Sequence, residues 1–294
     1  MAASERHEFR VMGSAAHIIT VGGATGVAPG LESRLRDLES LWSRFSPTSD
    51  ITRLNQAGGD TLGVHPDTIM LVQRAIDGWR LTRGSFDPTV LRSMIDAGYG
   101  PDLIAGLPSG SGCAGIEVDP TAGTIRFAVG VAFDPGGVGK GLAADLVASE
   151  GVAAGAAGVL VNVGGDLRAI GAAPTPEGWT VGVEDPFDET HTVAVPRIGD
   201  GGVATSTPSH RRWTVDGRPG LHVVDPVTRR PIVTDVASVT VIAGEAWMAE
   251  VASKAAIVAG FDRAADTLDD LGVSGFAISG DGHMRLASTL GAFL

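Results

Sequence analysis

The stretch Asp134-Pro135-Gly136-Gly137-Val138-Gly139-Lys140-Gly141 lies between an apolar segment, 124–131, that predicts a strand and a segment, 143–148, that predicts a short helix. Successive glycines let backbone N–H groups approach an anion, and a following helix adds the positive end of its dipole. Lys140 would add a formal charge. The same loop also fits a tight turn from strand to helix, and its residues alone favour neither interpretation.

The loop differs from two familiar phosphate-binding motifs. A P-loop has a glycine five residues before its second glycine and Ser or Thr after its lysine, whereas this chain has Asp134 and Gly141 at those positions. Its glycines also lack the G-x-G-x-x-G spacing of dinucleotide-binding folds. An anion bound here would therefore be held by a different arrangement.

Four aspartates before and after the loop occupy similar positions. Asp87, Asp134, Asp166 and Asp225 each stand at the edge of an apolar segment beside Gly or Pro. Turn formation explains each one alone, because Asp hydrogen-bonds to its own backbone at such corners. Together they suggest a shared polar site. His222, close to Asp225, would face either the core or a cleft.

Hydroxyl groups and a pair of opposite charges follow later in the chain. Thr205-Ser206 would place hydroxyls near a phosphate, although a glycine-rich entry into a strand explains these residues equally well. Glu250 and Lys254 lie four residues apart on a predicted helix, 246–259. They would form an exposed ion pair worth about 0.3 kcal/mol or hold a cation over a diphosphate.

The surrounding sequence predicts a mixture of helices and strands. Apolar residues recur every three or four positions from Leu31 to Phe45 and again from Pro66 to Gly84, which predicts two amphipathic helices. Further strands are predicted at 159–163, 179–183, 221–224, 239–242, 276–279 and 283–287, the last two forming a hairpin. Because the two kinds of element do not alternate strictly, the predicted fold class is α+β.

Composition excludes several classes of protein. The 294 residues include 34 acidic and 22 basic side chains, and a net charge of −12 disfavours general binding to nucleic acids or anionic lipids. The single cysteine, Cys113, excludes an intramolecular disulfide, and without an activating cation nearby we expect it to be unreactive. The uncharged segment 11–31 holds five glycines and a proline, and the first residues do not resemble a secretory signal. We therefore expect a cytoplasmic protein without a membrane anchor.

Taken in order, these segments resemble the ApbE family, the FAD:protein FMN transferases. The similarity extends from position 12 to about 260, and the colinear order of the segments is what makes it specific. The segments are Met12-Gly13-Ser14, Phe45-Ser46 with Ser49-Asp50-Ile51 and Arg53-Leu54-Asn55, 84–90, 134–145, 161–166, Trp179 with Asp185-Pro186, Ala204-Thr205-Ser206, and His222 with Asp225-Pro226.

The resemblance implies both a fold and a reaction. It implies one ApbE-like domain over residues 1–294, with a core of about 10–290, formed by two interleaved α/β lobes with an FAD cleft between them. The family transfers FMN from FAD to a Ser or Thr hydroxyl of an acceptor protein and releases AMP, with magnesium on the diphosphate. FAD, Mg²⁺ and an acceptor protein are therefore the expected partners.

The resemblance also assigns roles to individual residues. His222 matches the histidine that deprotonates the acceptor hydroxyl or stabilises the developing charge, and Asp134 and Lys140 are the other expected catalytic residues. The Gly139 carbonyl and Glu250 are the expected metal ligands. The residues expected to contact FAD are Met12, Phe45, Ser85, Phe86, Asp87, Asp134, Lys140, Thr205, His222 and Lys254.

Two positions of the family's metal-binding helix differ in this chain. The family has Ala-Asp followed four residues later by Thr, whereas this chain has Ala249-Glu250 and Lys254. A lysine ammonium is not a metal ligand and repels a cation. We therefore expect Lys254 to neutralise the diphosphate, with Glu250 holding it in place, and metal dependence to be weakened or lost.

Two further departures concern the flavin and the chain after Thr205-Ser206. Thr48 stands where the family has an aromatic residue, so flavin stacking would fall to Phe45 or Phe86. The segment 207–210 replaces the family's Gly, acidic residue and Tyr.

The leading hypothesis is an FAD:protein FMN transferase. Hydrolysis of FAD to FMN and AMP is a second hypothesis, and FAD binding without catalysis is a third. Release of AMP separates the first two from the third, and covalent flavin on an acceptor separates the first from the second.

Overall fold

The computed structural model describes residues 3–23, 26–99, 104, 112–208, 212–215, 218–221 and 223–293. The chain divides into two compact units, each assembled from separate stretches of sequence. The first unit comprises Met1–Asp37, Lys140–Thr207 and Asp235–Leu294, and the second comprises Leu38–Gly139 and Pro208–Thr234. The boundary between the two units thus falls within the glycine loop, between Gly139 and Lys140. One family domain over residues 1–294 stays a prediction.

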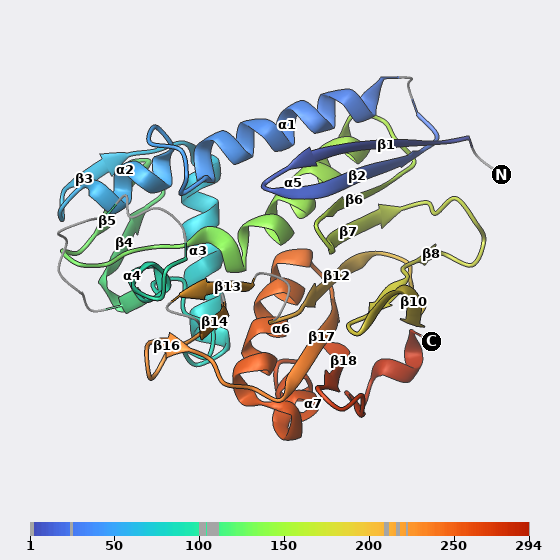
Figure 1. The fold of residues 1–294 in the computed structure, drawn as a ribbon. Helices are drawn as coiled ribbons and strands as arrows, with labels where there is room; N and C mark the ends of the chain where they lie inside the picture. Colours follow the sequence, from blue (N-terminus) through green and yellow to red (C-terminus); the bar gives the residue numbers. More distant parts are fainter. Residues whose placement is uncertain are drawn as a thin grey trace. The chain divides into compact units, whose positions relative to one another are not determined.

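The first unit is formed around an eight-stranded antiparallel sheet (Figure 1). Its strands, in spatial order, are β1 (Ser4–Val11), β2 (Ser14–Val21), β6 (Gly158–Val163), β7 (Asp166–Gly171), β12 (Gly201–Ser206), β17 (Val236–Ala243), β18 (Ser274–Ser279) and β19 (Met284–Leu286). The turn between β1 and β2 is Met12-Gly13, and both residues have positive φ, 51° and 71°. Such φ values match the twist of a two-residue hairpin.

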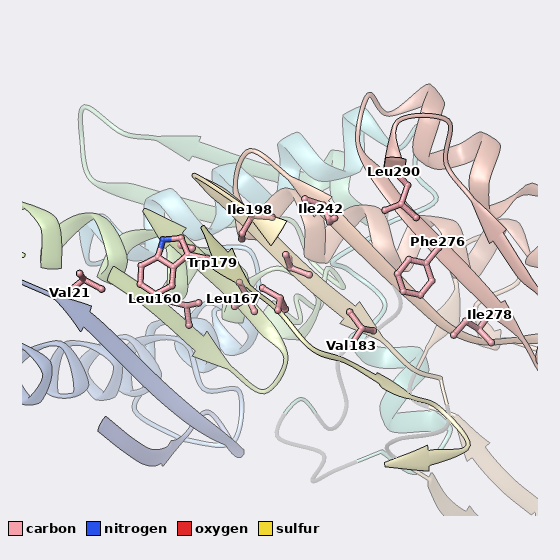
Figure 2. Close-up of a cluster of buried hydrophobic side chains, with 13 residues drawn as sticks. Val21, Leu160, Leu167, Trp179, Val183, Ile198, Ile242, Phe276, Ile278 and Leu290 are labelled. Carbon is pink, nitrogen blue, oxygen red and sulfur yellow. The ribbon is translucent and has the colours of Figure 1, made fainter. Parts of the chain in front are cut away.

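One face of this sheet carries a large apolar cluster around Trp179 (Figure 2). Leu160, Phe276 and Ile278 of the sheet pack there with Trp179 of β8 (Trp179–Thr180). The strands β9 (Val183–Asp185), β10 (Asp188–Ala194) and β11 (Arg197–Ile198) contribute further side chains to the cluster. Burial of these side chains stabilises the sheet that presents the polar residues described below.

Two glycines bring the start of helix α6 (Ala246–Ala259) close to the sheet and to helix α5 (Gly139–Ala153). A Cβ on Gly202 of β12 would lie 2.3 Å from the Ala246 nitrogen, and one on Gly141 of α5 would lie 2.5 Å from the Ala246 carbonyl oxygen. No side chain fits at either place. This unit also contains helix α7 (Phe261–Asp270), the short 3₁₀ helix η3 (Leu290–Ala292) and most of helix α1 (Val27–Trp42), whose end belongs to the second unit.

The second unit contains a small antiparallel sheet, β3 (Thr61–Gly63), β5 (Thr124–Phe127) and β4 (Ile116–Asp119), with several helices. The helices are α2 (Asp50–Gln56), α3 (Pro66–Leu81), α4 (Leu91–Asp96), η1 (Gly112–Gly115) and η2 (Pro135–Gly137). Two hairpins complete it, β13 (Arg212–Val215) with β14 (Arg218–Leu221) and β15 (Val224–Asp225) with β16 (Arg230–Pro231). The Asn55 side chain exchanges two hydrogen bonds with the Phe133 backbone, at 2.9 and 2.8 Å, and so fixes the start of the glycine loop.

The α+β class is confirmed, and so are the helix over 246–259 and the closing hairpin. The helix predicted over 143–148 is longer, because α5 already begins at Gly139 and includes Lys140. The helix predicted to reach Phe45 ends at Trp42, where the Ser49 hydroxyl donates to the Ser43 carbonyl and turns the chain. The strand predicted over 124–131 ends at Phe127.

Two predicted strands are wrong as single elements because the chain changes partner within them. In 179–183, Trp179 pairs with β11 and Val183 with β10. In 221–224, Leu221 pairs with Arg212 while Val224 pairs with Pro231. The β1–β2 hairpin and helices α2, α4 and α7 were not predicted, and the hairpin accounts for much of the uncharged segment 11–31.

Candidate functional site

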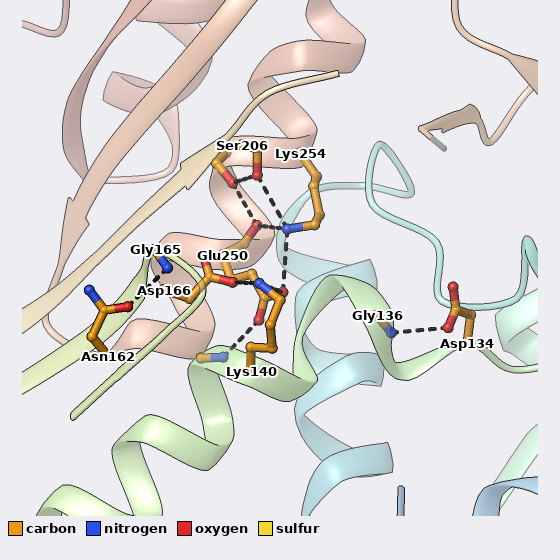
Figure 3. Close-up of polar contacts among 11 residues, drawn as sticks. Asp134, Gly136, Lys140, Asn162, Gly165, Asp166, Ser206, Glu250 and Lys254 are labelled. Atoms are coloured by element: carbon orange, nitrogen blue, oxygen red, sulfur yellow. Dashed lines mark hydrogen bonds and ion pairs between the residues drawn. The ribbon is translucent and has the colours of Figure 1, made fainter. Parts of the chain in front are cut away.

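Four charged side chains of the first unit meet where α5, β7 and α6 come together (Figure 3). Lys140, in the first turn of α5, forms an ion pair with Asp166, the first residue of β7. Its Nζ also lies 3.7 Å from Glu250 Oε1. Lys254 Nζ lies 3.4 Å from the same oxygen. We call Lys140, Asp166, Glu250 and Lys254 the lysine–carboxylate cluster.

The chain contains two lysines among 294 residues, and both belong to this cluster. All twenty other basic residues are arginines. The scarcity of lysine in the sequence was therefore a signal for this site that the motifs did not include. The two lysines are 114 positions apart, and the fold brings both to one carboxylate.

Glu250 is fully buried and its two oxygens have different partners. Oε2 accepts a hydrogen bond of 2.8 Å from the Gly141 N–H, and Oε1 faces the two ammonium groups. Burial raises the pKa of Glu250, and the nearby Asp166 raises it further, whereas Lys254, Lys140 and the Gly141 N–H lower it. A carboxylate at this depth requires such partners, since an unpaired buried charge is strongly unfavourable.

Hydroxyl groups extend the cluster along the end of β12. Ser206 Oγ lies 2.6 Å from Ser253 Oγ and accepts from Lys254 Nζ at 3.3 Å. Thr205 Oγ1 lies 3.0 Å from Thr240 Oγ1 across the β12–β17 pair. Lys254 Nζ also contacts the Glu250 carbonyl oxygen at 3.2 Å. The Thr205 hydroxyl thus pairs with the neighbouring strand β17, while the Ser206 hydroxyl contacts Lys254.

These residues do not fit a magnesium site. Mg²⁺ binds oxygen ligands in near-octahedral geometry at about 2.0–2.1 Å. Here the oxygens of Glu250 already pair with a backbone N–H and two ammonium groups, and those ammonium groups would repel a divalent cation. The described part of the chain holds no group of three or more His, Cys, Asp or Glu residues arranged for a metal. We therefore assign no metal to Glu250 and the Gly139 carbonyl.

In the second unit, Arg44 joins the exposed ring of Phe45 to Asp134 of the glycine loop. The Arg44 guanidinium lies 4.3 Å from the Phe45 ring centre and 5.0 Å from that of Tyr99, and its Nε lies 3.5 Å from Asp134 Oδ1. Asp134 also caps η2 by accepting from the Gly136 N–H at 3.1 Å (Figure 3). Phe45 is 54% exposed and free to meet a ring from outside. Arg44 itself was not predicted, because only its tertiary contacts distinguish it.

The segment Gly84–Thr89 holds its predicted site residues differently. Phe86 and Asp87 are buried and Ser85 is half-buried. Asp87 Oδ1 accepts from the Thr89 backbone at 2.8 Å, and Oδ2 accepts from Arg229 at 2.9 Å. Arg229 has a positive φ of 56°. Of the two aromatic residues expected to stack on flavin, Phe45 presents an accessible ring.

The other candidate residues that the structure describes lie outside the lysine–carboxylate cluster and the Arg44 contacts. Met12 is a partly buried turn residue, and Asp225 accepts from the Val227 N–H at 2.8 Å, as its turn interpretation predicts. Burial, reinforced by Asp87, raises the pKa of the Cys113 thiol to about 12, so the thiol stays protonated at neutral pH. His222 lies outside the described residues. No helix among the described residues has both the length and the apolar character needed to span a bilayer.

The sequence matches the ApbE family over residues 12–286. The chain belongs to the ApbE family. This match includes both compact units and every residue of the lysine–carboxylate cluster.

Known ApbE proteins resemble the chain in sequence and in fold. The FAD:protein FMN transferase of Treponema pallidum strain Nichols is 28% identical over 86% of this chain and 77% of its own length. That of Salmonella typhimurium strain LT2 is 35% identical over 50% of this chain, and the match covers only 42% of that protein. The crystal structure of the ApbE protein from Thermotoga maritima MSB8 superposes with a TM-score of 0.88 at 24% identity, covering 99% of each chain. That similarity establishes the ApbE fold.

Proposed function

We propose that this protein transfers FMN from FAD to a Ser or Thr hydroxyl of an acceptor protein. The observation that carries the proposal is the ApbE family match over residues 12–286, supported by relatives that bear the name FAD:protein FMN transferase. The lysine–carboxylate cluster adds chemistry suited to a diphosphate, and Phe45 adds an accessible ring suited to flavin.

The reaction exchanges the phosphoanhydride bond of the FAD diphosphate for a phosphoester bond to the acceptor. The acceptor hydroxyl oxygen bonds to the phosphorus on the FMN side of the diphosphate. The bond from that phosphorus to the bridging oxygen breaks, and the bridging oxygen leaves with AMP. The hydroxyl proton goes to a base, the role that we propose for His222. Transfer of this kind depends mainly on positioning and on stabilising the charge of the phosphoryl oxygens.

Roles are proposed here for residues of each unit taken separately. Lys140 and Lys254 bind and neutralise the diphosphate, while Asp166 and Glu250 keep the ammonium groups oriented. Phe45 stacks on the flavin ring. Arg44 holds Phe45 and Asp134 in place through its ring contact and its ion pair.

The test is to incubate the purified protein with FAD and a peptide library that has Ser or Thr at a fixed position, and to follow AMP and peptide mass. AMP together with an FMN-sized mass gain on peptides supports transfer. AMP with free FMN and unmodified peptide establishes hydrolysis instead, and bound FAD without AMP overturns both catalytic readings. His222→Ala should abolish the mass gain, whereas His283→Ala, an exposed histidine, should leave it unchanged.

A further inference from the structure

We propose that Lys140 and Lys254 serve as a built-in cation pair that binds the FAD diphosphate in place of a divalent metal. The inference rests on the proposed function, because it names the group of FAD that the lysine–carboxylate cluster recognises. Its basis is that the two lysines of the chain converge on Glu250, a carboxylate that has no surface in contact with solvent.

In the lysine–carboxylate cluster the two lysines are partly exposed to solvent and the two carboxylates are buried behind them. Lys140 and Lys254 are each 20% exposed, whereas Asp166 and Glu250 are 1% and 0% exposed. An anion arriving from solvent therefore meets the ammonium groups first. A cation would meet the same ammonium groups and would find the carboxylates behind them. The arrangement attracts a diphosphate and excludes Mg²⁺ by the same geometry.

The contacts of Lys254 leave room for a ligand. Its Nζ lies 3.2, 3.4 and 3.3 Å from the Glu250 carbonyl oxygen, Glu250 Oε1 and Ser206 Oγ. Strong charge-assisted bonds are shorter, about 2.7–2.9 Å. A phosphate oxygen can therefore replace one of these long contacts with a shorter one. Glu250 would retain its hydrogen bond from the Gly141 N–H during that exchange.

The first experiment measures binding of FAD and of ADP, which carries the same diphosphate, with EDTA and with Mg²⁺. The wild-type affinity should be the same in both conditions. Lys254→Met should weaken both ligands by about tenfold or more, the loss expected for one charge-assisted contact. Lys254→Arg should retain most of the affinity. Arg285→Met, an equal change of charge at an exposed residue of β19, should have no effect.

The second experiment restores the family's residue at position 254. Lys254→Thr should bind ADP weakly in EDTA and recover affinity when Mg²⁺ is added, because removing the ammonium allows a cation to approach Glu250. Mn²⁺ added to wild-type protein with ADP should give the same electron paramagnetic resonance signal as Mn²⁺ with ADP and no protein, whereas Lys254→Thr should reduce that signal further. Circular dichroism and thermal melting confirm that each variant is folded.

The outcomes separate this inference from the proposed function. FAD binding in EDTA without AMP release or peptide modification would support the cation pair and overturn transfer. Transfer that occurs only with Mg²⁺ would support transfer and overturn the cation pair. Mn²⁺ bound by the wild-type protein with ADP, beyond what ADP binds by itself, would overturn the cation pair and leave transfer standing. Lys254→Met binding ADP as tightly as the wild type would also overturn it.

Discussion

Asp145 and Glu250 are two buried carboxylates that join the same two helices in opposite directions. Asp145 of α5 accepts from the Ala246 and Trp247 N–H groups at the start of α6, at 2.8 and 2.9 Å. Glu250 of α6 accepts from the Gly141 N–H in the first turn of α5 at 2.8 Å. Each carboxylate thus satisfies N–H groups that a helix start leaves without an intrahelical partner.

The two carboxylates differ in the groups that contact their oxygens. Both Asp145 oxygens are taken by backbone groups, and Arg168 lies 3.5 Å from Oδ1. Only one Glu250 oxygen is taken by the backbone, and the other faces two partly exposed lysines. A closed shell of backbone donors indicates a structural role. A buried carboxylate oxygen that faces two partly exposed ammonium groups indicates a binding site.

The largest expected effect is on stability, from Asp145→Ala. The substitution leaves the buried Ala246 and Trp247 N–H groups without an acceptor and removes the buried one of two carboxylates beside Arg168, which should lower the free energy of unfolding by about 3–5 kcal/mol. Urea unfolding followed by circular dichroism measures it. Asp200→Ala, which removes the exposed partner of the same Arg168, should change stability by less than about 1 kcal/mol. Equal losses in both variants would contradict the structural role of Asp145.

The second expected effect is a pH dependence of stability from Asp145. Burial raises the pKa of Asp145 to about 7, against the opposing effects of the Ala246 and Trp247 N–H groups and Arg168. The unfolded chain releases this proton near pH 4, so the folded state binds more protons between pH 4 and 7. The contribution of Asp145 to the free energy of unfolding should therefore fall across this window, by up to about 4 kcal/mol. Unfolding of Asp145→Asn across the same pH range should lack this decline, and an identical decline in the variant would assign it to other groups.

The third prediction concerns the negative charge of Glu250. Glu250→Gln retains an oxygen for the Gly141 N–H but removes the negative charge between the lysines. ADP affinity in EDTA should rise severalfold, by an increment of about 1 kcal/mol, because the ammonium groups lose a competing anion. Fluorescence or calorimetric titration measures the change. A metal-binding Glu250 would give the opposite result, weaker binding that Mg²⁺ cannot restore.

The smallest expected effect comes from Ser206→Ala, which removes one partner of Lys254. The lysine keeps its two Glu250 contacts, so ADP affinity should fall by no more than about fivefold. Ser274→Ala is a suitable control, because in the described part of the chain its buried hydroxyl has no hydrogen-bond partner. A loss as large as that of Lys254→Met would mean that Ser206 contacts the diphosphate directly.

The sequence predicts much of the fold where local patterns dominate. The apolar helix around Glu250 and Lys254 was predicted with both of its ends, and Gly280-Asp281-Gly282 predicted the closing hairpin. Elements whose ends depend on distant partners were predicted less well. The divided strand at 179–183 is an example, since its two halves pair with β11 and β10. The helix ending at Trp42 was misjudged for a nearer reason, because the hydrogen bond from the Ser49 hydroxyl to the Ser43 carbonyl is not part of the apolar pattern.

The candidate site was predicted in part for the same reason. Glu250 and Lys254 were predicted as a pair four residues apart and Lys140 was singled out separately, but the approach of Lys140 to Glu250 depends on contacts more than 100 residues apart along the chain. Arg44 and Arg229 carry no local signal, and their roles follow from Phe45, Asp134 and Asp87 only after folding. Asp145 was hidden within an apolar helix in the same way.

The most direct test of the built-in cation pair uses the fact that the chain has two lysines. Protein labelled with ¹³C at the lysine ε-carbon should give two signals in a carbon–proton correlation spectrum, assigned with Lys254→Met. Adding ADP in EDTA should shift both signals, and adding Mg²⁺ afterwards should leave them where they are. Signals that do not move until Mg²⁺ is present would show that a metal, rather than these lysines, binds the diphosphate.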